Sequence, residues 1–241
     1  MLLRLSKTTM KKTYSFSRLS SWSECSLMWK YNYEDNLGGE ANFFNEMGSL
    51  CHLIFEGVDR GKITDPLKAF QTGYKKRVRP HKEEWYENWY LDCYKFFRNW
   101  KGHDKKSVWI EEYHKAEFDD FFLQGYVDRV YYDKGYVIQD YKVSKPFPKK
   151  DLKKKTRQLY LYSRFIKERF GEFPRELSFF FFRQNKVVKI PFNERDYNEA
   201  LEWAKNTVKE IESKAWSDTK DGSDYFCQEV CSFRNICEIR N

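Results

Sequence analysis

The chain carries the run Leu123-Gln-Gly-Tyr-Val-Asp-Arg-Val-Tyr-Tyr-Asp-Lys-Gly-Tyr-Val-Ile-Gln-Asp-Tyr-Lys-Val-Ser144 near its centre. The two halves of this run are rich in Val, Ile and Tyr, which favour β-strands. Between them lies Asp133-Lys-Gly135, and Asp and Gly are the usual residues of a tight turn between two strands. The run therefore predicts a β-hairpin, from which the rest of the fold can be worked out.

Two carboxylates and one lysine on these two strands suggest a site. Asp128 interrupts the first strand, whereas Asp140 and Lys142 lie two residues apart on the second and so project from the same face. Carboxylates are hard oxygen ligands that suit Mg²⁺ or Mn²⁺. A lysine beside them can stabilise a developing negative charge or help to activate a water molecule. Taken alone, the pattern fits a metal site and exposed charge on a solvated sheet face equally well.

The order of residues in the hairpin carries more information than its composition. Gly125-Tyr-Val-Asp-Arg129 followed by Ile138-Gln-Asp-Tyr-Lys142 closely resembles the PD-(D/E)XK nuclease superfamily. The motifs G-x-(I/V)-D-R and (I/V)-x-D-Y-K are those of its RecB-like branch. The resemblance implies an α/β fold of the restriction-endonuclease type, with a central mixed β-sheet flanked by helices. It also implies metal-dependent hydrolysis of phosphodiester bonds.

A histidine upstream extends the resemblance. Residues 47–56 predict a short helix, and His52 follows Gly48-Ser49 in the family pattern G-(S/T)-x-x-H. Neutral imidazole is a good metal ligand, although a lone histidine on an amphipathic helix is usually a structural residue. The preceding Gly-Ser and the acidic residues downstream favour a functional role for His52.

The resemblance assigns a role to each of these residues. It implies that His52, Asp128 and Asp140 hold one or two Mg²⁺ or Mn²⁺ ions, with the carbonyl of Tyr141 as a further ligand. Lys142 would position or activate the attacking water and stabilise the transition state.

The helix expected after the hairpin contributes a further motif. Residues 156–170 form an amphipathic pattern that Gly171 closes. Gln158 and Tyr162 lie four residues apart, so both can reach the same point, and they match the Q-x-x-x-Y motif of the RecB-like branch. The resemblance implies that the pair supports the active site and the DNA backbone. Without it, Tyr162 would be assigned to the core.

A basic run precedes this helix. After the Pro-containing breaker at residues 144–148, the sequence supplies five candidates for nucleic-acid binding: Lys149, Lys150, Lys153, Lys154 and Arg157. Such a run is most often solvated surface. Its position next to the expected active strand makes contact with DNA phosphates an equally good interpretation.

Three cysteines close the chain, Cys227, Cys231 and Cys237. Three thiols within eleven residues indicate a metal site in a protein that we expect to be intracellular. The RecB-like family more often has two residues between the first pair, whereas three separate Cys227 from Cys231 here, which leaves zinc, or a lost cluster, open. Cys51 and Cys93 have no such partners and are expected to be buried thiols.

The fourth ligand comes from the resemblance. Residues 15–25 are similar to the N-terminal motif S-x-S-x-L-x-x-Y-x-x-C-P, with Trp22 in place of the tyrosine and Ser26 in place of the proline. In RecB-like nucleases with an iron–sulfur cluster, including the nuclease of CRISPR spacer acquisition, this cysteine completes the ligand set. The resemblance therefore implies a [4Fe–4S] cluster held by Cys25 and the three C-terminal cysteines.

The remaining elements follow from local patterns. We expect a loose basic leader at residues 1–14, then one nuclease domain over residues 15–241. Within it, residues 63–104 predict a helical insertion that packs on the sheet, and residues 225–241 form the cysteine segment closing on Cys25. An aromatic wall for a DNA channel is the alternative for residues 63–104.

Caps and further strands complete the expected elements. Ser17 and Asn193 are the expected N-caps of two helices. Residues 108–123 predict a strand before the hairpin. On that strand Glu111 or Glu112 could be an extra ligand, although an exposed acid is the favoured interpretation. Two more strands are expected at residues 177–182 and 187–190.

Composition limits the classes of function. The 241 residues include 44 Lys and Arg against 36 Asp and Glu, a net charge of +8, and 19% are aromatic, which fits a nucleic-acid partner. No apolar run reaches the ~20 residues of a membrane span. No G-x-x-x-x-G-K-(S/T) loop is present, so the chain is not a motor by itself.

We therefore expect a cytoplasmic, Mg²⁺- or Mn²⁺-dependent DNA exonuclease of a bacterium or phage-infected cell. It would act on single strands or DNA ends in recombination, repair or phage DNA metabolism, with a helicase or recombination protein as a candidate partner. The alternatives are a non-catalytic DNA-binding or partner module that keeps the fold, and a zinc-stabilised structural protein.

Overall fold

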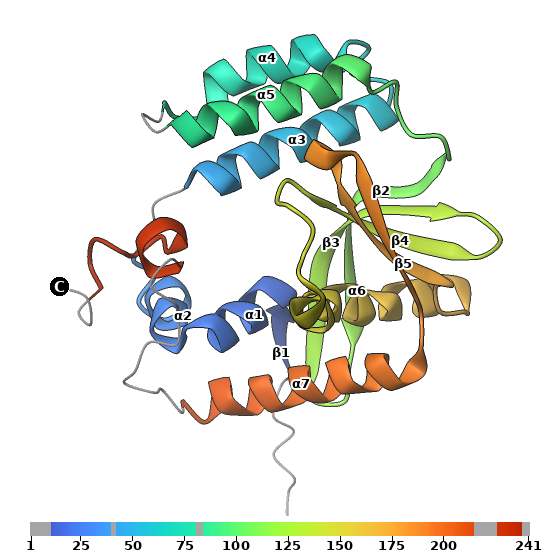
Figure 1. The fold of residues 1–241 in the computed structure, drawn as a ribbon. Helices are drawn as coiled ribbons and strands as arrows, with labels where there is room; N and C mark the ends of the chain where they lie inside the picture. The colour runs from blue at the N-terminus through green and yellow to red at the C-terminus, as the bar shows by residue number, and fades with distance from the viewer. Residues whose placement is uncertain (1–10, 40–41, 81–83, 215–225, 238–241) are drawn as a thin grey trace, which may run out of the picture.

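A computed structural model describes residues 11–39, 42–80, 84–214 and 226–237. Its centre is a six-stranded sheet with helices on both faces (Figure 1). The sheet is mixed, because β1 pairs with β3 and β4 with β5 in parallel, whereas the other pairs are antiparallel. The strands are β1 (Lys12–Ser15), β2 (Ser107–Glu117), β3 (Phe121–Tyr132), β4 (Tyr136–Lys142), β5 (Glu176–Phe181) and β6 (Lys186–Pro191).

Strand β3 organises the sheet. One of its edges pairs with β2 along most of its length. The other edge is shared, because β1 pairs with residues 121–124 and β4 pairs with residues 129–132. Residues 125–128 therefore lie at a fork, where β3 passes from one neighbour to the next. In open α/β sheets a ligand commonly binds where neighbouring strands diverge in this way.

The predicted hairpin is confirmed as β3 and β4. The turn closes through a hydrogen bond from Asp133 N to Gly135 O at 2.9 Å. Lys134 and Gly135 both have positive φ, at 55° and 134°. The turn needs glycine at the second of these positions, because a Cβ there would lie 2.9 Å from the Cβ of Arg175.

Helices cover the two faces of the sheet as two groups (Figure 1). Helices α1, α6 and α7 share one apolar core with the sheet, and α3, α4 and α5 share a second core on the other face. Among the described helices, none combines the length and apolar character of a membrane span. The helices are α1 (Phe16–Glu24), α2 (Ser26–Tyr33), α3 (Phe43–Asp59), α4 (Pro66–Arg77), α5 (Glu84–Asn99), α6 (Lys149–Phe170) and α7 (Glu194–Glu212), with short turns η1 (Phe182–Gln184) and η2 (Phe226–Val230).

The region expected to be a helical insertion contains α4 and α5. Two of its aromatic side chains, Phe96 and Phe97, are buried against Phe55 of α3. Phe55 in turn contacts Tyr141 of β4 at 4.4 Å between ring centroids. The aromatic-rich segment thus packs on the sheet through α3, as the favoured interpretation had it.

Two local expectations are wrong. The loose leader cannot extend to residue 14, because Lys12–Ser15 form β1; a four-residue strand carries too little periodicity to be seen in sequence, and its pairing depends on β3. The N-cap of α1 is Ser15 rather than Ser17, since the Ser15 side chain accepts the hydrogen bond of Arg18 N at 3.1 Å. The expected cap of α7 by Asn193 is confirmed.

Candidate active site

Three side chains from three elements meet beside the fork. His52 of α3, Glu111 of β2 and Asp128 of β3 place one ligand atom each within 4.8 Å of one another. His52 Nδ1 lies 2.6 Å from Glu111 Oε1 and 3.8 Å from Asp128 Oδ1. The predicted proximity of His52 and Asp128 is thus observed, although they are 76 positions apart in sequence.

Glu111 is the residue that the sequence interpretation undervalued. Its side chain is 17% exposed and faces His52, whereas that of Glu112 is 49% exposed. The expectation of an exposed acid is therefore wrong for Glu111. The β2–β3 pairing skips Glu111, whose φ is 46° while the residues on both sides remain paired. Such a left-handed conformation costs roughly 1–3 kcal/mol outside glycine and is characteristic of functional sites.

A second pair lies on β4, at the same end of the sheet. Lys142 Nζ is 2.6 Å from Asp140 Oδ2, so the two side chains share a face as their spacing predicted. Asp128 Oδ2 accepts a hydrogen bond from the backbone N–H of Tyr141 at 2.8 Å. This bond joins β3 to β4 across the fork and fixes Asp128 next to the pair on β4.

Burial and crowding set the protonation of these groups. Burial opposes a charge on His52, but the carboxylates, Asp128 first, outweigh it and raise its pKa from 6.5 to about 9. Burial raises the pKa of Asp140 from 3.8 to about 6, against the opposing effect of Lys142. Burial also raises the pKa of Asp128. For both carboxyl groups, burial outweighs the opposing positive charges of Lys142 and His52.

The donor set suits a hard divalent cation. Carboxylate oxygens and one imidazole nitrogen converge within bonding reach of a shared point, and they are ligands that Mg²⁺ and Mn²⁺ accept. A cation there would supply the positive charge that the buried carboxylates need, and His52 would have to give up its proton to bind it. Nothing observed bears on the Tyr141 carbonyl as a ligand, which stays a prediction.

Helix α6 brings Tyr162 to the same place. Burial raises the pKa of Tyr162, the charges of Asp128 and Asp140 act in the same direction, and a hydrogen bond with Gln158 opposes them. The Tyr162 hydroxyl lies so close to Gly125 that a Cβ there would be 2.3 Å away. The glycine of the G-x-V-D-R motif thus leaves room for Tyr162.

One buried neighbour of the site was not singled out from the sequence. His103, between α5 and β2, stacks on Tyr141 with an interplanar angle of 3° and lies 2.9 Å from its hydroxyl through Nε2. Burial, then Arg129, lowers the pKa of His103 from 6.5 to about 3, so it is neutral. His52 packs edge-on against the same ring. No sequence pattern relates His103 to Tyr141, because only the chain path after α5 brings them together.

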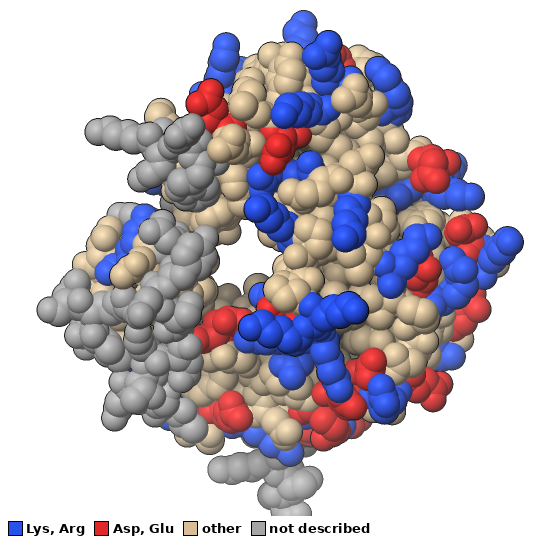
Figure 2. Space-filling model, viewed as in Figure 1, with Lys and Arg blue, Asp and Glu red and all other residues tan. Residues whose placement is uncertain are grey.

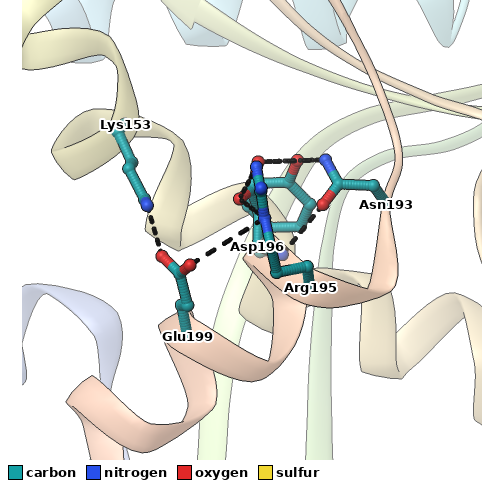
Figure 3. A network of polar contacts seen from close by, with 6 residues as sticks. Lys153, Asn193, Arg195, Asp196 and Glu199 are labelled. Carbon is teal, nitrogen blue, oxygen red and sulfur yellow. Dashed lines mark hydrogen bonds and ion pairs between the residues drawn. The ribbon is translucent and has the colours of Figure 1, made fainter.

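The basic run falls on the first turns of α6, where part of it is already paired. Lys153 forms an ion pair with Glu199 of α7, within a network that Arg195, Asp196 and Asn193 continue (Figure 3). Four members of the run remain. Lys154 pairs with Glu24 at 2.8 Å, Arg157 stacks over Trp203, and Lys149 and Lys150 are exposed.

Open space lies beside the site, although no Lys or Arg among the described residues lines the cavity next to it. Figure 2 shows an opening through the molecule between α3 and α1, with Lys and Arg side chains along its edge. A cavity of about 620 Å³ lies beside the metal-ligand candidates and is lined by His52 and Glu111, among others. A phosphate chain could therefore reach the site without a change of fold.

The four cysteines expected to share a cofactor line one small cavity between α2 and η2. They are Cys25, Cys227, Cys231 and Cys237. Among the described residues, no three of their sulfur atoms lie within 4.8 Å of one another, so they do not form a single-ion site. Cys51 and Cys93 are buried elsewhere, as expected, and the structure places them next to each other.

Comparison with known proteins identifies the family. The family model described as the PD-(D/E)XK nuclease superfamily matches residues 13–238. No curated protein matches the sequence.

Two solved structures are similar to the chain. One is a "putative exonuclease" from Eubacterium rectale, with a TM-score of 0.55, 13% identity and coverage of 100% of this chain and 92% of that chain. The other, SSO0001, has a TM-score of 0.36 and 12% identity, covering 90% of this chain and 96% of that chain. At 13% identity, the similarity to the Eubacterium rectale structure shows a shared fold and nothing more.

Proposed function

Because the chain belongs to the PD-(D/E)XK nuclease superfamily, we propose that it is a Mg²⁺- or Mn²⁺-dependent nuclease that hydrolyses phosphodiester bonds in DNA. The observation that carries the proposal is the convergence of His52, Glu111 and Asp128 beside the Asp140–Lys142 pair. A module that only binds DNA has no need to keep buried carboxylates together at a cost in folding free energy.

Each group has a role that its surroundings support. His52, Glu111, Asp128 and Asp140 would hold the cation. Once bound, it supplies Lewis-acid chemistry, lowering the pKa of a water and neutralising charge on the phosphate. Lys142 keeps its proton, because Asp140 and Asp128 outweigh its burial and raise its pKa.

Because Lys142 is charged, its role in the proposed reaction is electrostatic. It would stabilise negative charge that develops on the phosphate and orient the attacking water, rather than accept a proton from it. Gln158 and Tyr162 would hold the far side of the site, where the Tyr162 hydroxyl packs on Gly125.

We propose exonuclease action on single strands or DNA ends in recombination, repair or phage DNA metabolism, with a helicase or recombination protein as partner. The E. rectale protein, described as an exonuclease, supports this choice only by analogy of fold. The Lys and Arg side chains at the edge of the opening could contact the phosphate backbone of a DNA strand.

We further propose that Cys25, Cys227, Cys231 and Cys237 hold a [4Fe–4S] cluster that fastens the N-terminal helices to the C-terminal segment. Their shared cavity supports a common cofactor. Four cysteine thiolates are also a ligand set of tetrahedral zinc, so a zinc site is the alternative. Iron and sulfide analysis of anaerobically purified protein tests this, and zinc without iron would overturn it.

The nuclease proposal is tested with end-labelled linear single- and double-stranded DNA and Mn²⁺. Wild type should degrade it progressively from an end, and Asp140→Ala and Lys142→Ala should abolish the activity. Anaerobic purification keeps a labile cluster from hiding the result. A folded wild-type protein that binds DNA without cutting it would favour the non-catalytic module.

A further inference from the structure

An exposed aromatic ring stands at the edge of the candidate active site. Tyr126 of β3 is 61% exposed. It lies two residues before Asp128, roughly 6.6 Å along the strand. Together with His52 and Glu111 it lines the cavity of about 620 Å³. None of the roles assigned so far uses this ring.

A second tyrosine holds Tyr126 in place. Tyr113 of β2 is its direct cross-strand partner, and the two rings meet edge to face at 5.5 Å between centroids. The Tyr113 hydroxyl donates a hydrogen bond to Gln124 Oε1 at 3.0 Å. Cross-strand aromatic pairs of this kind stabilise each other's orientation. Tyr126 therefore presents a supported ring whose remaining surface is open to solvent.

Packing of the buried core does not account for this placement. The apolar side chains of β3 that build the core, such as Leu123 and Val127, are fully buried on the opposite face. Tyr126 contributes to neither of the two main cores. Leu53 of α3, the residue after His52, is exposed in the same cavity. The cavity thus has an aromatic and an aliphatic wall directly beside charged ligands, an arrangement suited to a flat apolar group attached to a phosphate.

We propose that Tyr126, held by Tyr113, stacks on an unpaired base of a DNA strand whose neighbouring phosphate lies at the metal-ligand cluster. Base–aromatic stacking tolerates any sequence, because every base has a π-face. A base inside a duplex has both faces covered by its neighbours and is not available. The inference rests on the proposed nuclease function and deepens it: the strand at the site is single-stranded at that base.

The test measures DNA affinity in a background without cleavage. Lys142→Ala is suitable because it leaves the metal-ligand candidates in place. The probes are a labelled oligo(dT) with Mn²⁺ and the same strand with one abasic residue, moved position by position. The variants are Tyr126→Ala, Tyr126→Phe and the matched control Tyr132→Ala, which removes a ring 58% exposed at the other end of β3.

Tyr126→Ala should weaken oligo(dT) binding about 5- to 150-fold, while Tyr126→Phe and Tyr132→Ala bind as the background does. One abasic position should weaken the background but not Tyr126→Ala, because the stacking partner is already gone. The inference would be overturned if the abasic residue weakened binding equally with and without Tyr126→Ala, or if Tyr126→Ala bound oligo(dT) with full affinity. Either result would leave the nuclease proposal intact. If the background binds no DNA at all, the proposed function fails and the inference with it.

Discussion

Backbone conformation and steric contact determine which residues can stand at this site, in addition to the chemistry of their side chains. Glu111 holds its carboxylate near His52 only through a left-handed backbone conformation. Gly125 is required because the Tyr162 hydroxyl occupies the space of a side chain. Neither constraint follows from residue type alone, and both can be tested by substitution.

Glu111→Gln should weaken Mn²⁺ binding by about tenfold or more, because it removes a carboxylate from the ligand cluster. Isothermal titration calorimetry measures this directly. Glu112→Gln is the matched control, because it removes the same charge from the neighbouring residue, whose side chain is exposed. Equal affinities of the two variants would exclude Glu111 as a ligand.

Gly125→Ala should lower the free energy of unfolding by about 1–3 kcal/mol, because the new methyl group would lie 2.3 Å from the Tyr162 hydroxyl. For a chain of this size each kcal/mol corresponds to about 2–4 °C in Tm. Gly48→Ala in α3 meets no atom within 4 Å and should be neutral or stabilising. Thermal denaturation compares the two; an unchanged Tm for Gly125→Ala would show that Tyr162 moves aside.

At the level of elements, the sequence predicted the strands and helices that have a regular apolar pattern, with a period of two in strands and 3.6 in helices. Asp140 and Lys142 were correctly placed on one face. The end of α6 at Gly171 was also correct, but its start was not, because the basic run expected before the helix forms its first turns from Lys149. The strand β1 was missed because its stability comes from pairing with β3. Glu111 was misjudged because apolar–polar alternation carries no sign of a positive φ. His103 was missed because its contact with Tyr141 depends on the path of the chain between α5 and β2.

The α5–β2 connection should make stability depend on pH. His103 is neutral in the fold, with a pKa of about 3, whereas in the unfolded chain it takes up a proton below about 6.5. The free energy of unfolding should therefore fall as pH drops from 6.5 towards 3. Urea denaturation at pH 7 and pH 5 should show a smaller loss for His103→Gln than for wild type. Identical losses would contradict the assignment of a neutral His103.

Helix α6 should contact DNA unevenly along its basic run. Lys149→Ala/Lys150→Ala should reduce the dependence of log affinity on log salt by about 1.4, as two phosphate contacts to a single strand are lost. Lys153→Ala/Lys154→Ala should change it less, since Glu199 and Glu24 already pair with these amines. Fluorescence anisotropy over a range of NaCl concentrations separates the two, and the reverse order would show that DNA displaces the ion pairs.

At the scale of the whole molecule, the sheet separates two apolar cores, and the candidate site lies where both groups of helices reach it. The α3 group supplies His52, the α6 group supplies Gln158 and Tyr162, and the forked sheet supplies the acids and Lys142. The resemblance to the family motifs implied from sequence that His52, Asp128, Asp140 and Lys142 lie together, and the structure brings these residues together. The backbone irregularity at Glu111 and the aromatic pair beside it could be found only in three dimensions.

The most direct test of the account is the rate of DNA cleavage over a range of Mn²⁺ concentrations. Wild type, Glu111→Gln and Lys142→Ala are compared, with EDTA as the blank. We expect Glu111→Gln to need more Mn²⁺ and to recover activity as it saturates. Lys142→Ala should stay inactive even at saturating Mn²⁺, because its charge acts on the reaction rather than on metal binding. Cleavage by wild type in EDTA, or full activity of Lys142→Ala, would contradict the account.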